Sequence, residues 1–288
     1  MGVRFGMRRG LVVMLIAGLA LAAGAAIAAG GLKTKKAQVS VAPGTTKSAT
    51  AKCKQGTRAI SGGFEAPPLA STSSAGSYVQ TFTTRRTTRR AWKSTATNYF
   101  AQPDSGTLTD FAYCSGHLPK LEAKSKSRTI PDQETQSVKV RCPKGGEAVS
   151  GGFQAETHAS NFTGTFPLQS RRLGNRTWKV TAYSSKPSGG ATITAYAYCA
   201  KHAIGLDERS ATTSFSGTHR NISAKARCKK GKQAISGGFD APADGNSGAY
   251  VEPFKSKRAR ERGWKAATAA YPDSGQTVNW TVYVYCLS

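Results

Sequence analysis

The chain has 288 residues, of which 39% are hydrophobic and 19% charged, with 31 glycines and a formal net charge of +26. Abundant Thr, Ser, Ala, Val and Tyr exclude a disordered chain and favour strands and turns over helices. Forty-one lysines and arginines against 15 acidic residues predict a surface that attracts polyanions at low and moderate salt.

Residues 1–28 are predicted to be a signal peptide. A head with three arginines precedes an apolar stretch from Leu11, and the tripeptide Ala-Ile-Ala that ends at Ala28 suits signal peptidase. Cleavage after Ala28 removes those arginines and lowers the net charge from +26 to about +23. The alternative is an uncleaved N-terminal anchor, because the run from Leu11 to Leu32 is almost long enough to span a bilayer.

The six cysteines all follow this segment and indicate an oxidising destination, where paired thiols persist. We therefore expect a secreted or cell-surface protein. After cleavage of the signal we expect no membrane span.

A repeated unit follows, and it occurs three times. The motif Cys-x-x-Gly-x-x-Ala-(Ile/Val)-Ser-Gly-Gly-Phe begins at Cys53, Cys142 and Cys228, with spacings of 89 and 86 residues. Each copy continues with Trp-Lys and closes with an alternating strand that ends in Tyr-Cys. The predicted units are residues 33–116, 121–201 and 207–288, joined by short segments.

Each unit reads as a strand, a turn and a strand before its first cysteine, followed by the glycine-rich strand, the tryptophan strand and the tyrosine strand. Six or seven strands in about 85 residues are the density of a small antiparallel sandwich or barrel. The predicted fold class is all-β, with three tandem antiparallel β-sandwich-like repeats. The sequence leaves open whether the repeats pack together or form separate beads.

Period-two alternation assigns side chains to faces. Trp264 and Ala266 share a face opposite Lys265, so the tryptophan is expected inside. Tyr283 and Tyr285 share a face and either pack in a covered core or form an exposed ridge that stacks on a sugar. The paired glycines predict a bulge or a close strand approach. A phosphate loop is disfavoured because no helix pattern follows them.

The repeat selects one disulfide pairing from the fifteen that six cysteines allow. The predicted bonds join Cys53 to Cys114, Cys142 to Cys199 and Cys228 to Cys286. Each would close a loop of about sixty residues and contribute about 4 kcal/mol. The alternative joins Cys114 to Cys142 and Cys199 to Cys228, and leaves Cys53 to pair with Cys286.

No shared catalytic site is predicted. The four histidines, His117, His158, His202 and His219, fall at unrelated positions of the repeat. The chain has no nucleophile, metalloprotease or nucleotide motif, and no cysteine lies at metal-ligand spacing from another cysteine or from a histidine. We therefore expect a protein that is not an enzyme and uses no metal or cofactor. A hydrolase with one specialised repeat is the remaining catalytic alternative.

A basic run precedes each tryptophan, where a hairpin is expected to connect two strands. Arginines fixed at three equivalent tips would suit contacts to phosphate or carboxylate groups along a polymer. The alternative is a solvated loop that keeps the protein soluble and protects strand edges. The candidate polyanion-binding residues are Arg85, Arg86, Arg89, Arg90 and Lys93 in the first unit, Arg171, Arg172, Arg176 and Lys179 in the second, and Lys257, Arg258, Arg260, Arg262 and Lys265 in the third.

The order Cys-x-x-Gly, Gly-Gly-Phe, Trp and Tyr-Cys resembles a repeat of exported bacterial proteins, and this resemblance implies a disulfide-closed β unit without a known activity. Threefold β folds with one disulfide-rich unit in each third, such as the egg-envelope β-prism proteins, are similar in outline but have shorter units. We expect a non-enzymatic exported protein that binds an acidic polysaccharide, a cell-wall polymer or another polyanion, without specific recognition of nucleic acid. The other non-catalytic alternative is a lectin that binds neutral carbohydrate through exposed aromatic residues.

Overall fold

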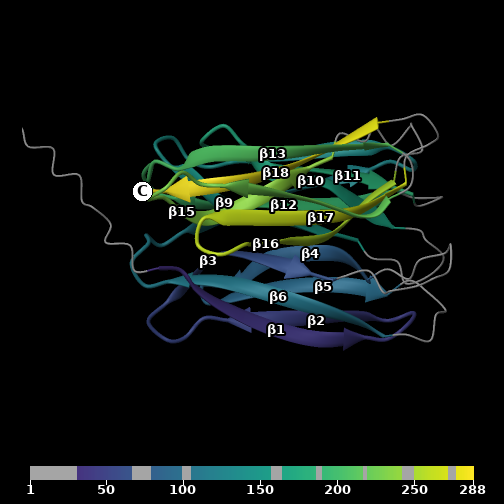
Figure 1. The fold of residues 1–288 in the computed structure, drawn as a ribbon, viewed down its shortest axis with the longest axis horizontal. Helices are drawn as coiled ribbons and strands as arrows, with labels where there is room; N and C mark the ends of the chain where they lie inside the picture. The colour runs from purple at the N-terminus through teal and green to yellow at the C-terminus, as the bar shows by residue number, and fades with distance from the viewer. Residues whose placement is uncertain are drawn as a thin grey trace, which may run out of the picture.

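All of the regular structure in the described part of the chain is β-strand. The computed structural model describes residues 31–66, 79–98, 105–156, 164–185, 190–216, 219–241, 250–271 and 277–288, and these residues form eighteen strands with no helix among them (Figure 1). The predicted all-β fold is therefore confirmed. The predicted signal peptide, residues 1–28, lies outside the described residues.

Each unit contributes six strands. The first unit contains β1 (Lys33–Val41), β2 (Thr46–Lys52), β3 (Arg58–Glu65), β4 (Val79–Thr88), β5 (Ala91–Asn98) and β6 (Gly106–Ser115). The second contains β7 (Glu122–Ile130), β8 (Thr135–Arg141), β9 (Glu147–Ala155), β10 (Thr165–Leu173), β11 (Thr177–Ser184) and β12 (Ala191–Ala200). The third contains β13 (Asp207–Ser216), β14 (His219–Arg227), β15 (Gln233–Asp240), β16 (Tyr250–Arg258), β17 (Gly263–Tyr271) and β18 (Thr277–Leu287).

Within a unit the strands form two three-stranded layers that pack face to face. In the first unit β1, β6 and β3 form one layer, and β2, β5 and β4 form the other. Trp92 of β5 lies between the layers against Gly62 of β3 and is 1% exposed. Trp178 and Trp264 occupy the same place in the other units, so the predicted inward orientation of the tryptophans is confirmed.

One disulfide joins the two layers of each unit. The first cysteine follows β2, β8 or β14 in one layer, and the second lies in β6, β12 or β18 of the other. The bonds link Cys53 to Cys114, Cys142 to Cys199 and Cys228 to Cys286. The predicted pairing within units is therefore confirmed, and the alternative pairing across units is wrong. Three disulfides indicate an oxidising, extracellular or secreted environment.

Each sheet is shared between two units. Strand β3 of the first unit pairs with β16 of the third, β9 of the second pairs with β4 of the first, and β15 of the third pairs with β10 of the second. The resulting sheets are β1-β6-β3-β16-β17-β14, β13-β18-β15-β10-β11-β8 and β2-β5-β4-β9-β12-β7. We call each pairing between units a seam. The three seams close the units into one body, which answers the question that the sequence left open.

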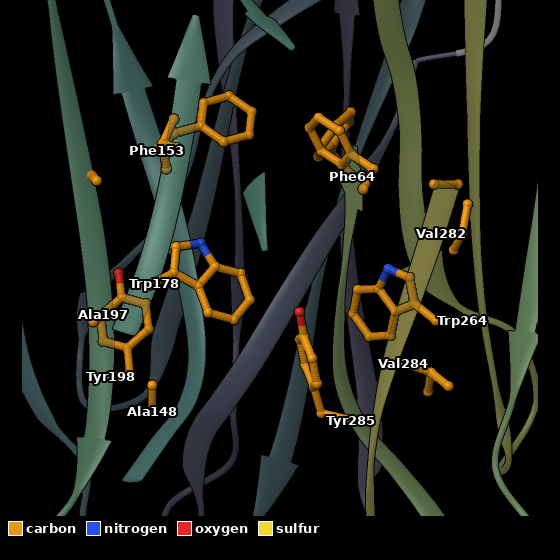
Figure 2. Packing of buried hydrophobic residues seen from close by; sticks show 14 of the residues in the cluster. Phe64, Ala148, Phe153, Trp178, Ala197, Tyr198, Trp264, Val282, Val284 and Tyr285 are labelled. Carbon is orange, nitrogen blue, oxygen red and sulfur yellow. The ribbon is translucent and has the colours of Figure 1, made fainter. Parts of the chain in front are cut away.

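The three Ser-Gly-Gly-Phe motifs meet at the centre of this body. The ring centroid of Phe153 lies 6.3 Å from those of Phe64 and Phe239, in edge-to-face contacts. Figure 2 labels Phe64 and Phe153. Each serine hydroxyl donates to a carbonyl of another unit: Ser61 to Ile235 at 2.5 Å, Ser150 to Ile60 at 2.6 Å and Ser236 to Val149 at 2.5 Å. The motif is repeated because each copy supplies one third of a cyclic contact.

The two glycines of the motif admit different neighbours. A Cβ atom at Gly151 would lie 2.2 Å from the indole of Trp178 in the same unit. A Cβ atom at Gly152 would lie 2.1 Å from the carbonyl oxygen of Thr84, across the seam. The corresponding glycines of the other units have the same two neighbours. The predicted close strand approach is therefore confirmed, and it occurs between units.

The alternating tyrosines of the last strand divide between core and surface. Tyr285 of β18 is buried beside Trp178 of the second unit, with ring centroids 5.7 Å apart (Figure 2). The backbone N–H of Arg172 donates to its hydroxyl at 2.6 Å, and burial raises the pKa of this phenol. Tyr283 is half-exposed on the outer face. The predicted core position is therefore confirmed for Tyr285, whereas Tyr283 lies half-exposed beneath the guanidinium of Arg171.

Candidate polyanion-binding surface

The three arginine-rich segments end in hairpin tips at one end of the molecule. Residues 89–90, 174–176 and 259–262 connect β4 to β5, β10 to β11 and β16 to β17. The strands β3, β9 and β15 each begin beside the tip of their own unit, where the backbone N–H groups of Ala59, Ala148 and Ala234 donate to tip carbonyls. Because each of these strands is antiparallel to the hairpin strand of the neighbouring unit, the three tips point in the same direction. The backbone N–H of Cys53 donates to the carbonyl of Arg90 at 2.7 Å, so the disulfides lie here too. We call this the cysteine end; in Figure 1 it carries the C label.

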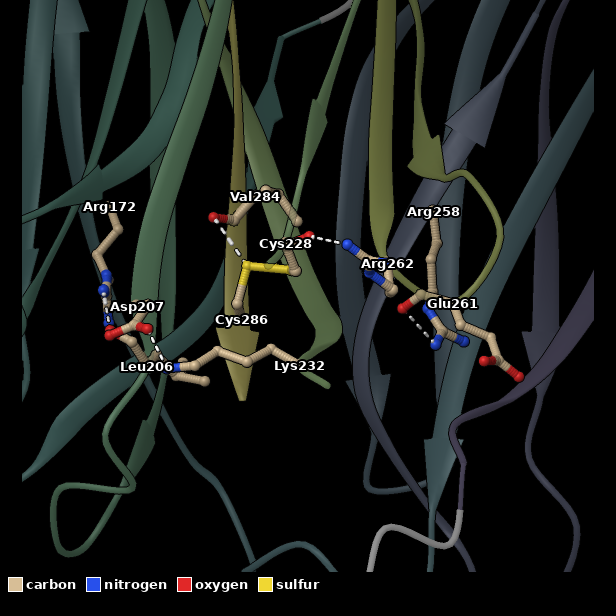
Figure 3. Close-up of a disulfide and its surroundings, with 10 residues drawn as sticks. All are labelled: Arg172, Leu206, Asp207, Cys228, Lys232, Arg258, Glu261, Arg262, Val284 and Cys286. Carbon is tan, nitrogen blue, oxygen red and sulfur yellow. Dashed lines mark hydrogen bonds and ion pairs between the residues drawn. A yellow bond between two sulfur atoms is a disulfide. The ribbon is translucent and has the colours of Figure 1, made fainter. Parts of the chain in front are cut away.

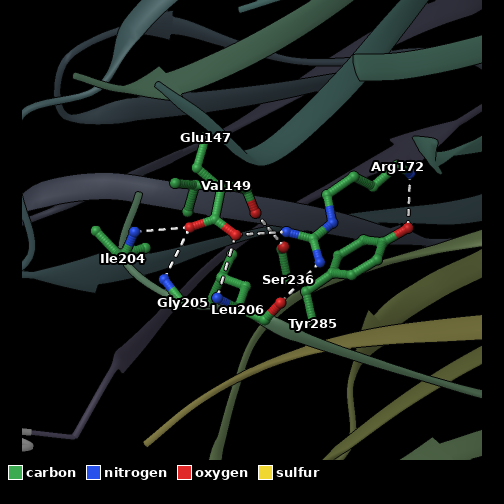
Figure 4. Close-up of polar contacts among 8 residues, drawn as sticks. All are labelled: Glu147, Val149, Arg172, Ile204, Gly205, Leu206, Ser236 and Tyr285. Atoms are coloured by element: carbon green, nitrogen blue, oxygen red, sulfur yellow. Dashed lines mark hydrogen bonds and ion pairs between the residues drawn. The ribbon is translucent and has the colours of Figure 1, made fainter. Parts of the chain in front are cut away.

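One arginine of each basic run belongs to a seam. Arg172 is 2% exposed, and its guanidinium lies 4.9 Å from the ring centroid of Tyr285 in the third unit. The guanidinium donates to Glu147 Oε1 and to the carbonyl of Leu206, both at 2.8 Å (Figure 4). The prediction that Arg172 can bind a polyanion is therefore wrong, because the third unit covers it.

Arg86 and Arg258 are placed in the same way at the other seams. The guanidinium of Arg86 lies 4.6 Å from the ring centroid of Tyr198 and donates to the carbonyl of Leu121 at 2.9 Å. The backbone N–H of Arg258 donates to the hydroxyl of Tyr113 at 2.7 Å. Burial lowers the pKa of both guanidinium groups. Both side chains are half-buried, and their main contacts join neighbouring units.

Glu147 is the charged partner that sequence reasoning missed. Its carboxylate accepts hydrogen bonds from Arg172 and from three consecutive backbone N–H groups of residues 204–206, at 2.7 to 3.1 Å (Figure 4). Glu147 therefore fixes the joint between the second and third units. A signal was present, since this acid stands where the other repeats have Arg58 and Gln233.

The residue before each seam arginine lies over an aromatic ring of the neighbouring unit. The distances to the ring centroid are 5.4 Å for Arg85 over Tyr196, 4.9 Å for Arg171 over Tyr283 and 5.1 Å for Lys257 over Phe111. Arg171 also forms an ion pair with Asp240 at 3.0 Å, and Lys257 pairs with Glu65. At these two seams, Asp240 and Glu65 therefore already balance the charges of Arg171 and Lys257.

These contacts also weigh against the lectin alternative. The half-exposed rings at the seams each have a cation over one face. The four tryptophans are all 1% exposed or less. The aromatic ridge that a neutral sugar would need therefore has no tryptophan in it.

The lysine after each tryptophan lies opposite these cations across its hairpin. The register pairs Lys93 with Arg85, Lys179 with Arg171 and Lys265 with Lys257. All three lysines are half-buried. Partial burial lowers the pKa of Lys179, and the nearby Arg171 and Lys139 lower it further.

The remaining predicted residues lie on the tips themselves. Arg89, Arg90, Arg260 and Arg262 are exposed, and Arg176 is half-exposed. Arg262 donates to the carbonyl of Cys228 at 2.8 Å (Figure 3), and Arg176 makes the equivalent bond to Cys142. These bonds hold two of the tip guanidinium groups against the disulfide loops.

The cysteine end carries a second set of cations that sequence reasoning missed. Each first cysteine has one cation directly before it and one or two shortly after it. These exposed residues are Lys52, Lys54, Arg141, Lys144, Arg227, Lys229 and Lys230. At the same end Asp207 pairs with Lys232 (Figure 3). The repeated Lys/Arg-Cys pattern was the available signal.

Two acids with raised pKa values lie within strands and not on the hairpin tips: Asp110 is buried in β6, and Glu252 in β16 is half-buried. Asp110 accepts hydrogen bonds from the Ser94 hydroxyl at 2.6 Å and from the Ala51 N–H at 2.8 Å, and burial raises its pKa to about 7. Burial also raises the pKa of Glu252 to about 7. Within the described ranges, no group of three or more His, Cys, Asp or Glu side chains could hold a metal ion.

Comparison of the sequence with family models and with curated protein sequences gave no match. The part of the chain that the structure describes contains no helix with the length and apolar character of a membrane span.

Proposed function

We propose that this protein is exported and binds acidic polymers of the cell envelope or extracellular space through the cysteine end, without carrying out a reaction. One observation carries the proposal: exposed cations from all three units gather at one end. The seam cations, in contrast, contact rings, carbonyls or carboxylates of the protein itself. The cysteine-end cations are therefore available to an external anion, and unlike the exposed cations scattered along the strands they lie together.

A polymer suits this surface better than a small ligand does. Each unit presents a basic disulfide loop beside a basic tip, so three equivalent patches point in one direction. A chain with repeated anionic groups can contact several patches at once, which raises its avidity above that of any single contact. Such contacts between exposed charges weaken as salt increases. The recognised chemistry is a row of carboxylate, phosphate or sulfate groups.

The test compares two triple variants with the same change in net charge. The end variant replaces one lysine of each disulfide loop with glutamine, at Lys54, Lys144 and Lys230. The control replaces three exposed lysines that lie along the strands, Lys36, Lys47 and Lys126. Both variants are applied to heparin-agarose and eluted with a salt gradient. We expect the end variant to elute at clearly lower salt than the wild-type protein, and the control to elute close to it.

Equal shifts for the two variants would show that net charge alone causes retention and would contradict the proposal. Retention of the wild-type protein that does not depend on salt would also contradict it. Competition by polygalacturonate and by polyphosphate then distinguishes a carboxylate polymer from a phosphate polymer.

A further inference from the structure

The tip of the third unit contains a basic pocket. It has a volume of about 370 Å³ and lies between the end of β14 and the tip. Its charged lining residues are Lys225, Arg227, Arg260, Glu261 and Arg262. A volume of this size accommodates a small ligand such as an acidic or phosphorylated sugar unit.

Features that only the third repeat has shape this pocket. Its tip has four residues, 259–262, whereas the tips of the first and second units have two and three. Arg260 has a left-handed backbone with φ of 60°, which is unusual for a residue other than glycine. Gly263 follows, where the other repeats have Ala91 and Thr177. A Cβ atom at Gly263 would lie 2.6 Å from the carbonyl oxygen of Ala259 and 2.9 Å from Lys225 Cε.

Hydrogen bonds hold the tip in this shape. The backbone N–H of Ala259 donates to the carbonyl of Gly263 at 2.7 Å and closes the turn. The carbonyl of Glu261 accepts from Arg258 Nη2 at 3.0 Å and from the backbone N–H of Ala234 at 2.8 Å. The pocket is therefore formed before any ligand arrives, which lowers the entropic cost of binding.

The charges around the pocket are not balanced. Partial burial lowers the pKa of Lys225, and Arg227, Arg260 and Lys265 lower it further. Glu261 is the one acid of the lining, and Figure 3 shows its side chain extending away from Arg262. None of the ion pairs within the described residues joins Glu261 to these cations. An anion in the pocket would relieve this repulsion.

We infer that this pocket binds the phosphate or sulfate group of an acidic ligand, with Arg227 and Arg260 as the principal donors. This inference rests on the proposed function and assigns to the third unit a discrete anion site within the cysteine end. Guanidinium groups suit the role, because they can donate two parallel hydrogen bonds to one oxyanion.

The test uses inorganic phosphate as the probe and protein labelled with ¹³C-lysine. We expect phosphate to shift the Lys225 ¹³Cε resonance in a saturable manner and to raise the pKa of that lysine. The pocket variant, Arg227→Ser with Arg260→Ser, should bind phosphate about tenfold more weakly or worse, since charge-assisted hydrogen bonds are lost. The control variant, Arg128→Ser with Arg209→Ser, removes two exposed arginines along the strands β7 and β13 and should leave phosphate binding unchanged.

A third variant, Gly263→Ala, crowds the pocket without changing its charge. It should weaken phosphate binding. The salt concentration at which the protein elutes from heparin-agarose should stay unchanged. Equal phosphate binding by the pocket and control variants, or a Lys225 signal that does not saturate, would overturn the inference. If either result occurs while the wild-type protein still binds heparin-agarose in a salt-dependent manner, the inference fails and the proposed function stands. If the wild-type protein does not bind heparin-agarose, the proposed function itself is refuted.

Discussion

Replacement of Gly152 with alanine tests whether the second glycine of each Ser-Gly-Gly-Phe motif allows two units to join. The added Cβ atom would lie 2.1 Å from the carbonyl oxygen of Thr84 and 3.2 Å from the Cα atom of Arg85. An ordinary contact between these atom types exceeds about 3 Å, so β9 and β4 would have to separate by about 1 Å. The seam pairs Thr83 with Gln154 and Thr84 with Phe153, and a separation of this size disturbs both pairs.

The expected cost follows from two contributions. Overpacking costs about 1–3 kcal/mol, and each weakened seam hydrogen bond adds about 0.5–1.5 kcal/mol. We expect Gly152→Ala to lower the free energy of unfolding by about 3–4 kcal/mol.

The matched control is Gly145→Ala in the same unit. Gly145 has φ of 81°, and a Cβ atom added there would have no other atom within 4 Å, so alanine meets only the left-handed backbone penalty of about 1–2 kcal/mol. Urea unfolding measured by tryptophan fluorescence compares the two variants. If Gly152→Ala lowers the free energy of unfolding by no more than Gly145→Ala does, the reasoning is refuted.

Three further predictions concern charges and the disulfides. Glu147→Gln should lower the free energy of unfolding by about 3–5 kcal/mol, because it leaves Arg172 buried without its counter-charge. The double variant with Arg172→Met should recover part of that loss. Additive losses in the double-mutant cycle would argue against the coupling. The native pKa of Asp110 is raised to about 7 from an ordinary 3.8, so the native state keeps a proton that the unfolded chain releases, and stability falls as the pH rises through this range. As the pH rises from about 4 to about 8, Asp110→Asn should therefore gain stability relative to the wild-type protein, by up to about 4 kcal/mol. Urea unfolding at several pH values measures this difference. A difference that does not depend on pH would contradict the prediction. Joint replacement of Cys53 and Cys114 by alanine opens a loop of 61 residues and should cost about 4 kcal/mol; an unchanged urea midpoint would count against the bond as a stabilising link.

The architecture within a unit could be predicted because its signals are local or repeated. The disulfide pairing followed from the threefold repetition of the cysteines, and the burial of Trp264 followed from strand alternation. The need for a close strand approach at Gly152 was also visible. The identity of the approaching strand was not visible, because strand alternation does not show which unit will supply the edge.

The basic runs show the limit of local reasoning more clearly. Arg171 and Arg172 are neighbours of the same type, yet Arg172 is buried and Arg171 is half-exposed. The difference comes from Tyr285 and the 204–206 segment, which belong to the far end of the chain and to a joint between units. The lysines beside the cysteines were visible in the sequence, but their convergence depends on the common direction of the three units.

The sharing of sheets also sets the number of copies. Each unit pairs through one edge strand with one neighbour and through a different edge strand with the other. In the first unit, β3 pairs with the third unit and β4 pairs with the second, so the contact is head-to-tail. Two copies would leave an unsatisfied edge at each end of the pair, open to further strands. The third copy occupies both edges at once, so one chain achieves the closure that separate subunits would otherwise have to reach by assembly.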